Sequence, residues 1–161
     1  MRRNIVNFLL FYAGWFICVE FQGWIALGTL ILIAAVQRLD WKLIAGAFVL
    51  GGLTDTFLEQ AGLLTYAGGP RIGFSCPLWI ACLWGLFATT LDRSMAFLKN
   101  RLGLAFALGA VAGPFTYWVA AGMGAVEMTT AGYAAIAIEF ALYTPLLLNP
   151  PRLLVLQRST S

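Results

Sequence analysis

Two carboxylates stand four residues apart inside an apolar stretch of this sequence. Asp55 and Glu59 lie in the run from Leu43 to Leu64, which is otherwise suited to cross a membrane. On a helix this spacing places both side chains on one face, with Cβ atoms roughly 5–6 Å apart. A carboxylate near the centre of a bilayer costs about 2.5–3.5 kcal/mol on insertion scales. Acids at such a depth are usually functional, so Asp55 and Glu59 are candidates for binding a ligand or a proton.

A third acid, Glu139, lies in the last apolar stretch, and helix lengths place it in the same half of the membrane as the first two acids. Tyr143 follows it by four residues, Tyr117 lies in the preceding apolar stretch, and Arg71 lies in the polar connection nearby. These side chains either line a shared cavity or pair with one another and only fix the helix packing. A shared cavity could carry a proton, bind a hard cation through oxygen ligands, or supply a general acid and base.

Small residues near these groups indicate close packing. Gly51 precedes Asp55 by four residues and leaves room on that face for a neighbouring helix or a ligand. Gly109 and Gly113 form a small-residue face of the kind that lets two membrane helices approach. Pro114 removes one backbone donor, so we expect a kink there.

The residues that are missing exclude several kinds of site. The chain contains no histidine, which rules out histidine-based metal sites and catalytic triads that need imidazole. Its three cysteines lack metal-binding spacing and are interpreted as small buried apolar residues. We therefore predict no metal site and identify neither a cofactor nor a catalytic residue. Whether the protein is an enzyme stays open.

Composition indicates a polytopic membrane protein. Of the 161 residues 61% are hydrophobic and only 11% are charged, against about 25% charged in a soluble domain. The start resembles a signal peptide but lacks a small-x-small cleavage site, so we expect an uncleaved first helix. We predict an all-α transmembrane bundle forming one domain, residues 1–161, although the first two helices are short and their full crossing stays open. The six helices are expected at about 5–19, 24–36, 43–64, 77–91, 102–124 and 133–148.

The charge distribution predicts the orientation of the bundle. Of ten basic residues, only Arg71 falls on the side opposite the termini. Loops rich in Lys and Arg stay in the cytoplasm, so both termini are expected there. Because the basic residues are scattered through short loops, the net charge of +3 does not indicate a nucleic-acid partner.

Two blocks carry a family resemblance. The segment from Pro77 to Thr90, and the segment from Gly109 to Trp118 with Gly122-x-Gly-Ala125 after it, resemble a family of small bacterial inner-membrane proteins of unknown function. The resemblance implies that genes of this family often lie near cyclopropane-fatty-acid-synthase-like genes in proteobacteria. The resemblance implies an inner-membrane location and a role in membrane-lipid modification or envelope stress, and it supplies no catalytic residues.

Three functions remain open on this basis. The first is membrane-lipid modification or lipid presentation through an acidic cavity in the outer half of the bilayer. The second is a small transporter or substrate-binding subunit coupled to protons or cations, and the third is a structural scaffold. The expected partners are the lipid bilayer, a lipid substrate, and either further copies of the chain or a membrane partner protein.

Overall fold

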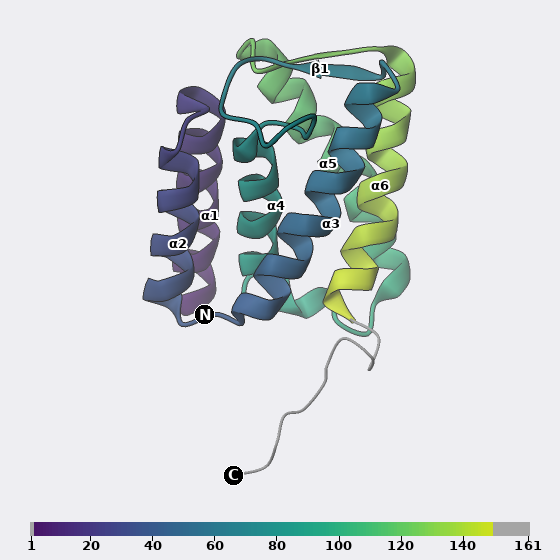
Figure 1. Ribbon diagram of the computed structural model, residues 1–161. Helices are drawn as coiled ribbons and strands as arrows, with labels where there is room; N and C mark the ends of the chain where they lie inside the picture. The colour runs from purple at the N-terminus through teal and green to yellow at the C-terminus, as the bar shows by residue number, and fades with distance from the viewer. Residues whose placement is uncertain (1, 150–161) are drawn as a thin grey trace.

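The computed structural model describes residues 2–149, which form an all-α bundle of six helices, as predicted (Figure 1). Four of these helices are long and apolar enough to cross a membrane, and two are shorter. The helices are α1 (Arg2–Phe21), α2 (Ile25–Gln37), α3 (Trp41–Gln60), α4 (Leu78–Leu91), α5 (Leu102–Gly122) and α6 (Thr130–Leu148), with a 3₁₀ turn η1 (Ala96–Leu98) before α5.

The two ends of the bundle differ in charge and in structure. The start of α1 and the end of α6 lie at one end, together with the loops after α2 and α4 (Figure 1). We call this the basic end because these segments and the start of α3 carry Arg2, Arg3, Arg38, Lys42, Arg93, Lys99 and Arg101. The opposite end carries two short strands and Arg71, and we call it the strand end.

The short helix α4 is the centre of one part of the bundle. It packs against α1, α2 and α3, and nearly all of its residues are buried. Its 14 residues rise about 21 Å, less than the roughly 30 Å of a bilayer core. At the strand end the loop after β1 covers it, where the Trp79 Nε1 donates to the Gly68 carbonyl over 3.1 Å. Irregular backbone at membrane depth is tolerated when protein surrounds it, so α4 can be short.

Helix α3 ends earlier than the sequence predicted. It stops at Gln60 rather than at Leu64 because Gly62 takes a left-handed conformation, with φ of +70°. The Leu63 N–H then bonds to the Leu58 carbonyl over 3.1 Å, and the Gly62 N–H bonds to the Glu59 carbonyl over 3.0 Å. This pair of bonds is the Schellman ending that glycine favours. Glu59 therefore lies in the last turn of α3, and Asp55 lies one turn deeper.

Two short strands, which the sequence analysis did not predict, follow from this early ending. Strand β1 (Leu64–Tyr66) pairs antiparallel with β2 (Val126–Met128), so the exit of α3 is joined to the entry of α6. Thr129 caps α6 by accepting from the Gly132 N–H over 3.0 Å, and its hydroxyl donates to the Leu63 carbonyl over 2.9 Å. The strands thus turn Tyr66 back toward the helices.

Other helix boundaries also differ from the prediction. Helix α1 extends past both ends of the predicted range 5–19. Its 20 residues are long and apolar enough to cross a membrane, a point that the sequence had left open. Helix α6 begins three residues before position 133 because Thr129 supplies the cap, and α5 ends two residues before position 124. Glu139 consequently lies nine residues after the start of α6, about 14 Å along its axis, rather than the six residues that a start at position 133 would give.

Candidate functional site

The candidate site is built around Asp55 on α3, whose side chain is 0% exposed. Its Oδ1 accepts hydrogen bonds from the hydroxyls of Tyr66 and Tyr117, the latter over 2.8 Å. Its Oδ2 accepts from the Trp84 Nε1 over 2.5 Å. The three donors come from β1, α5 and α4, so one carboxylate joins four elements of the fold. We call these four side chains the Asp55 cluster.

The tyrosine hydroxyls act as donors in this cluster. Burial raises the pKa of Tyr66 well above its usual value, and the negative charge of Asp55 adds to that shift. The Tyr66 hydroxyl therefore stays protonated at any physiological pH and donates a hydrogen bond to the carboxylate. The Tyr66 and Tyr117 oxygens are 3.3 Å apart, so the two hydroxyls also contact each other.

The absence of a side chain at Gly51 leaves space for the Trp84 ring. A Cβ atom built on Gly51 would overlap the Trp84 ring. Because Gly51 and Asp55 are one helical turn apart, the same face of α3 leaves space for the indole and accepts its N–H. The room that the sequence analysis noted beside Gly51 is filled by an aromatic side chain.

Glu59 and Arg71 form an ion pair at the strand end. The Arg71 guanidinium donates to both Glu59 oxygens, over 2.6 and 2.9 Å, and the Tyr66 N–H donates to the same carboxylate over 3.1 Å. The hydrogen bonds to Glu59 raise the pKa of Arg71 further. Since both Glu59 oxygens are engaged, this acid holds the loop and β1 against α3.

Glu139 differs from the other two acids. It is 5% exposed, and neither of its oxygens has a hydrogen-bond partner among residues 2–149. Tyr143, one turn further along α6, contacts Thr54 instead, with 2.6 Å between the hydroxyl oxygens. The sequence-predicted residues are therefore only partly brought together: Asp55 with Tyr117, and Glu59 with Arg71.

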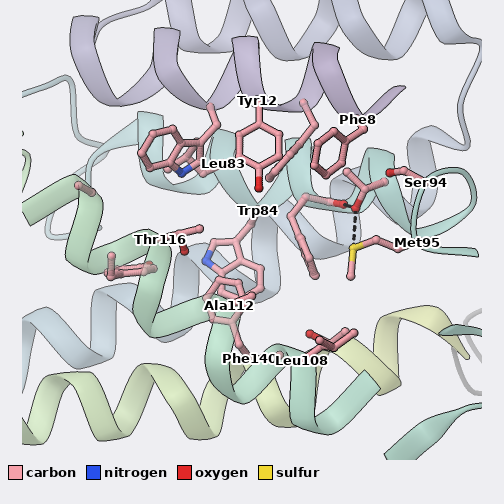
Figure 2. A pocket seen from close by; sticks show the side chains of 18 of the residues that line it. Phe8, Tyr12, Leu83, Trp84, Ser94, Met95, Leu108, Ala112, Thr116 and Phe140 are labelled. Atoms are coloured by element: carbon pink, nitrogen blue, oxygen red, sulfur yellow. Dashed lines mark hydrogen bonds between the residues drawn. The ribbon is translucent and has the colours of Figure 1, made fainter. Parts of the chain in front are cut away.

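A cavity of about 310 Å³ lies between α1, α4 and α5 (Figure 2). In this view Phe8 and Tyr12 project from α1, while Leu108, Ala112 and Thr116 come from α5 on the opposite side, with Trp84 between them. The wall is mainly apolar and aromatic, and no acidic or basic side chain of the described residues belongs to it. The cavity is therefore suited to an apolar ligand and differs from the acidic cavity that the sequence led us to expect.

The Asp55 cluster forms part of this cavity wall. Tyr66, Trp84 and Tyr117 all line the cavity, and all three donate to Asp55, which lies behind them. The carboxylate does not face the cavity and instead fixes the orientation of three of the rings that do. Asp55 thus acts as a positioning residue for the three aromatic side chains of the cavity wall.

The small residues of α5 set its distance from α6. A Cβ atom on Gly109 would overlap the Phe140 carbonyl oxygen, and one on Gly113 would overlap the Phe140 ring. Phe140 packs against Trp84 with ring centroids 4.6 Å apart and ring planes inclined by 32°. Pro114 lies within α5, one turn before Trp118. The close α5–α6 contact thereby holds Phe140 in the cavity wall.

Sequence reasoning missed Trp84, Tyr66 and Asn7. Neither Trp84 nor Tyr66 was predicted as a site residue, although the space beside Gly51 was a signal for a large neighbour. Asn7 is fully buried at the basic end and donates to the Gln37 side chain over 2.8 Å and the Thr89 carbonyl over 2.9 Å. An amide inside an apolar helix was the available signal.

A metal ion needs a set of ligand side chains that lie close together. No group of three cysteine or acidic side chains is close enough to hold a metal ion within residues 2–149. The cysteines Cys18, Cys76 and Cys82 are free and buried. The site therefore consists of the apolar cavity and the Asp55 carboxylate, whose two oxygens both accept hydrogen bonds.

Comparisons with known proteins identify a family and no function. A search of curated proteins gave no match, and a search of solved structures gave none either. The family model described as "Protein of unknown function (DUF2878)" matches residues 4–146, nearly the whole described part of the chain. The chain therefore belongs to the DUF2878 family, whose function is unknown.

Proposed function

We propose that this protein binds a membrane lipid by one of its apolar chains and presents the lipid within the bilayer. The observation that carries the proposal is the aromatic cavity between α1, α4 and α5. Its volume of about 310 Å³ falls at the lower end of the range for small-ligand pockets, about 300–1,000 Å³. Phe8, Tyr12 and Phe97 line it and are about half exposed, so the cavity opens toward the surroundings of the helices.

An acyl or isoprenoid chain suits this cavity better than a polar solute. Within a bilayer the chain already has apolar surroundings, so entering the cavity gains little hydrophobic free energy. The gain must come from packing against rigid surfaces, and aromatic rings held in place supply such surfaces. Asp55 fixes two tyrosines and Trp84 by hydrogen bonds, which keeps the wall in shape without a ligand.

Binding and presentation fit the site better than lipid modification by this chain alone. Both Asp55 oxygens and both Glu59 oxygens already accept hydrogen bonds. A general acid or base must reach its substrate within hydrogen-bond distance, and the described cavity wall offers hydroxyls but no carboxyl or amine. Chemistry on the bound lipid then belongs to a membrane partner protein.

The proposal is tested by the lipid that stays bound on purification. Native mass spectrometry of the protein in a neutral detergent should detect about one retained lipid per chain, since the cavity has room for one chain. Ala112→Trp places a large ring in the cavity and should remove that lipid. Val111→Trp is the matched control, because Val111 is 71% exposed on the same helix and does not line the cavity.

Two outcomes would refute this function. One is a protein that retains no lipid in any mild detergent. The other is an equal effect of Ala112→Trp and Val111→Trp, since annular lipids around the helices would respond to both substitutions alike.

The unpartnered Glu139 favours a second candidate, a small proton- or cation-coupled transporter. A buried carboxyl without partners among the described residues is costly as an ion, so it can exchange a proton when its surroundings change. Flux of protons or a solute into liposomes, abolished by Glu139→Gln, would favour this candidate over lipid presentation. Absence of flux over a broad solute panel would remove it.

A further inference from the structure

A second hollow, of about 530 Å³, lies at the basic end on the other side of α1. Four arginines surround it: Arg2 and Arg3 at the start of α1, Arg38 at the end of α2, and Arg93 after α4. We call it the arginine hollow. Its remaining lining is Val6, Leu10, Val36 and Gln37. Charged groups and aliphatic side chains therefore share one concave surface.

The charges of the arginine hollow are not neutralised within the described protein. Across residues 2–149 the ion pairs are Arg71 with Glu59 and Lys99 with Asp92, so none of the four arginines has a carboxylate partner there. Four cations brought to one concavity repel one another, and a bound anion relieves that repulsion. The hollow thus has the electrostatics of an anion site.

Part of the hollow is rigidly built. Arg93 donates from its Nη2 to the Gln37 carbonyl over 3.0 Å, which ties the loop after α4 to the end of α2. The Gln37 side-chain oxygen accepts from the buried Asn7, while its Nε2 has no hydrogen-bond partner among the described residues. Asn7 in turn accepts from the Ser94 hydroxyl over 2.7 Å. These bonds fix α1, α2 and the α4 loop around the hollow.

We propose that the arginine hollow binds a phosphate group, with an anionic membrane lipid as its source. Arginine guanidinium groups match phosphate geometry and bind it through paired hydrogen bonds. Basic pockets between membrane helices bind anionic headgroups, and Val6, Leu10 and Val36 offer apolar contact for the start of the lipid chains. Free inorganic phosphate presents the same chemistry without the chains. The site is separate from the aromatic cavity, so each proposal stands or falls alone.

The test uses the full chain purified in a neutral detergent, with short-chain probes that differ only in the group under test. Dioctanoyl phosphatidylglycerol supplies the phosphate on two chains, dioctanoylglycerol supplies the chains alone, and inorganic phosphate supplies the anion alone. Binding is measured by native mass spectrometry and by the rise in Tm during titration. We expect phosphatidylglycerol to bind and dioctanoylglycerol not to bind.

Arg3→Lys with Arg38→Lys is the diagnostic variant, because it keeps the net charge and the topology signal while losing paired hydrogen bonds. Loss of one charge-assisted hydrogen bond corresponds to about a tenfold weaker Kd for phosphatidylglycerol. Lys42→Gln with Arg101→Gln is the control, since these residues belong to the basic end and do not line the hollow. The control variant should bind as the wild type does.

Each outcome has a defined meaning. Inorganic phosphate binding as tightly as phosphatidylglycerol supports the phosphate site and assigns it to a soluble anion. Equal binding of phosphatidylglycerol and dioctanoylglycerol overturns the site. A control variant that binds phosphatidylglycerol more weakly, beside a diagnostic variant that binds it as the wild type does, also overturns the site, because a diffuse attraction to the whole basic end depends on net charge and not on paired hydrogen bonds.

Discussion

At the scale of single residues, the two most deeply buried acids have opposite surroundings. Asp55 accepts three hydrogen bonds from three different elements, whereas Glu139 accepts none among residues 2–149. Removing an acceptor from buried donors costs more than changing a group that has no partner. Asp55 is therefore a structural centre of the cavity wall, and Glu139 is the acid left available.

Asp55→Asn is expected to destabilise the protein much more than Glu139→Gln. Whichever way the new amide is turned, at least one of the three buried donors loses its acceptor, at about 1–3 kcal/mol for each donor. Glu139→Gln breaks no bond of the described structure and should change the free energy of unfolding by less than about 1 kcal/mol. Thermal unfolding in detergent measures both. Equal losses would contradict the assignment of different roles.

Residue types alone indicated which groups matter and could not indicate their partners. Their positions within apolar stretches marked Asp55 and Tyr117 as candidates, and left open whether they bind a ligand or each other. The structure joins them by a hydrogen bond and adds Trp84, which approaches from the next helix, α4. Such partners depend on how helices rotate against one another, which no local spacing fixes.

At the scale of the elements, helix α3 supplies three features that form the site: a glycine that leaves space for an indole, a carboxylate that accepts its hydrogen bond, and a glycine that ends the helix. Gly51 admits Trp84, Asp55 bonds to it, and Gly62 ends the helix so that β1 can return Tyr66. The ending was readable in principle, since a glycine after the last turn favours a Schellman motif. The apolar run continued beyond it to Leu64, and hydrophobicity does not distinguish a buried strand from a further helical turn.

Gly51→Ala is expected to damage α3 packing, whereas Gly46→Ala in the same helix should not. The new methyl at position 51 would overlap the Trp84 ring, which is confined by Phe140, so we expect a cost of about 1–3 kcal/mol. A Cβ at position 46 meets open space, and alanine there favours the helix by up to about 1 kcal/mol. The Tm and the near-UV circular dichroism, to which Trp84 contributes together with the other five tryptophans, check the pair. A tolerated Gly51→Ala would mean that the indole is free to move.

At the scale of the whole molecule, the helices form two groups with the aromatic cavity beside their junction. Helix α4 gathers α1, α2 and α3, while α5 packs closely on α6. The Asp55 cluster and the paired strands connect the groups at the strand end. The six-helix count followed from the apolar runs, but this grouping did not, because apolar stripes facing lipid and apolar stripes facing protein look alike in a sequence.

The distribution of basic residues predicts how the whole molecule is oriented in the membrane. The basic end should face the cytoplasm, because short loops rich in Lys and Arg are retained there. Phe74 is 92% exposed in the loop at the strand end, and Lys42 lies at the basic end. A membrane-impermeant maleimide should label Phe74→Cys in intact cells and should label Lys42→Cys only after the membrane is opened. The reverse pattern would invert the bundle and place the arginine hollow outside.

The native cysteines make this labelling experiment readable. Cys76 lies two residues from position 74 but is buried, and burial raises the pKa of its thiol to about 12. The thiolate is the reactive form and exists only near or above the pKa, so Cys76 stays protonated and unreactive from about pH 7 to about pH 9. The wild-type protein should therefore show no labelling that increases over this range. If labelling appears and rises with pH, the loop over α4 opens in the membrane, and the strand end is then a dynamic entrance to the aromatic cavity.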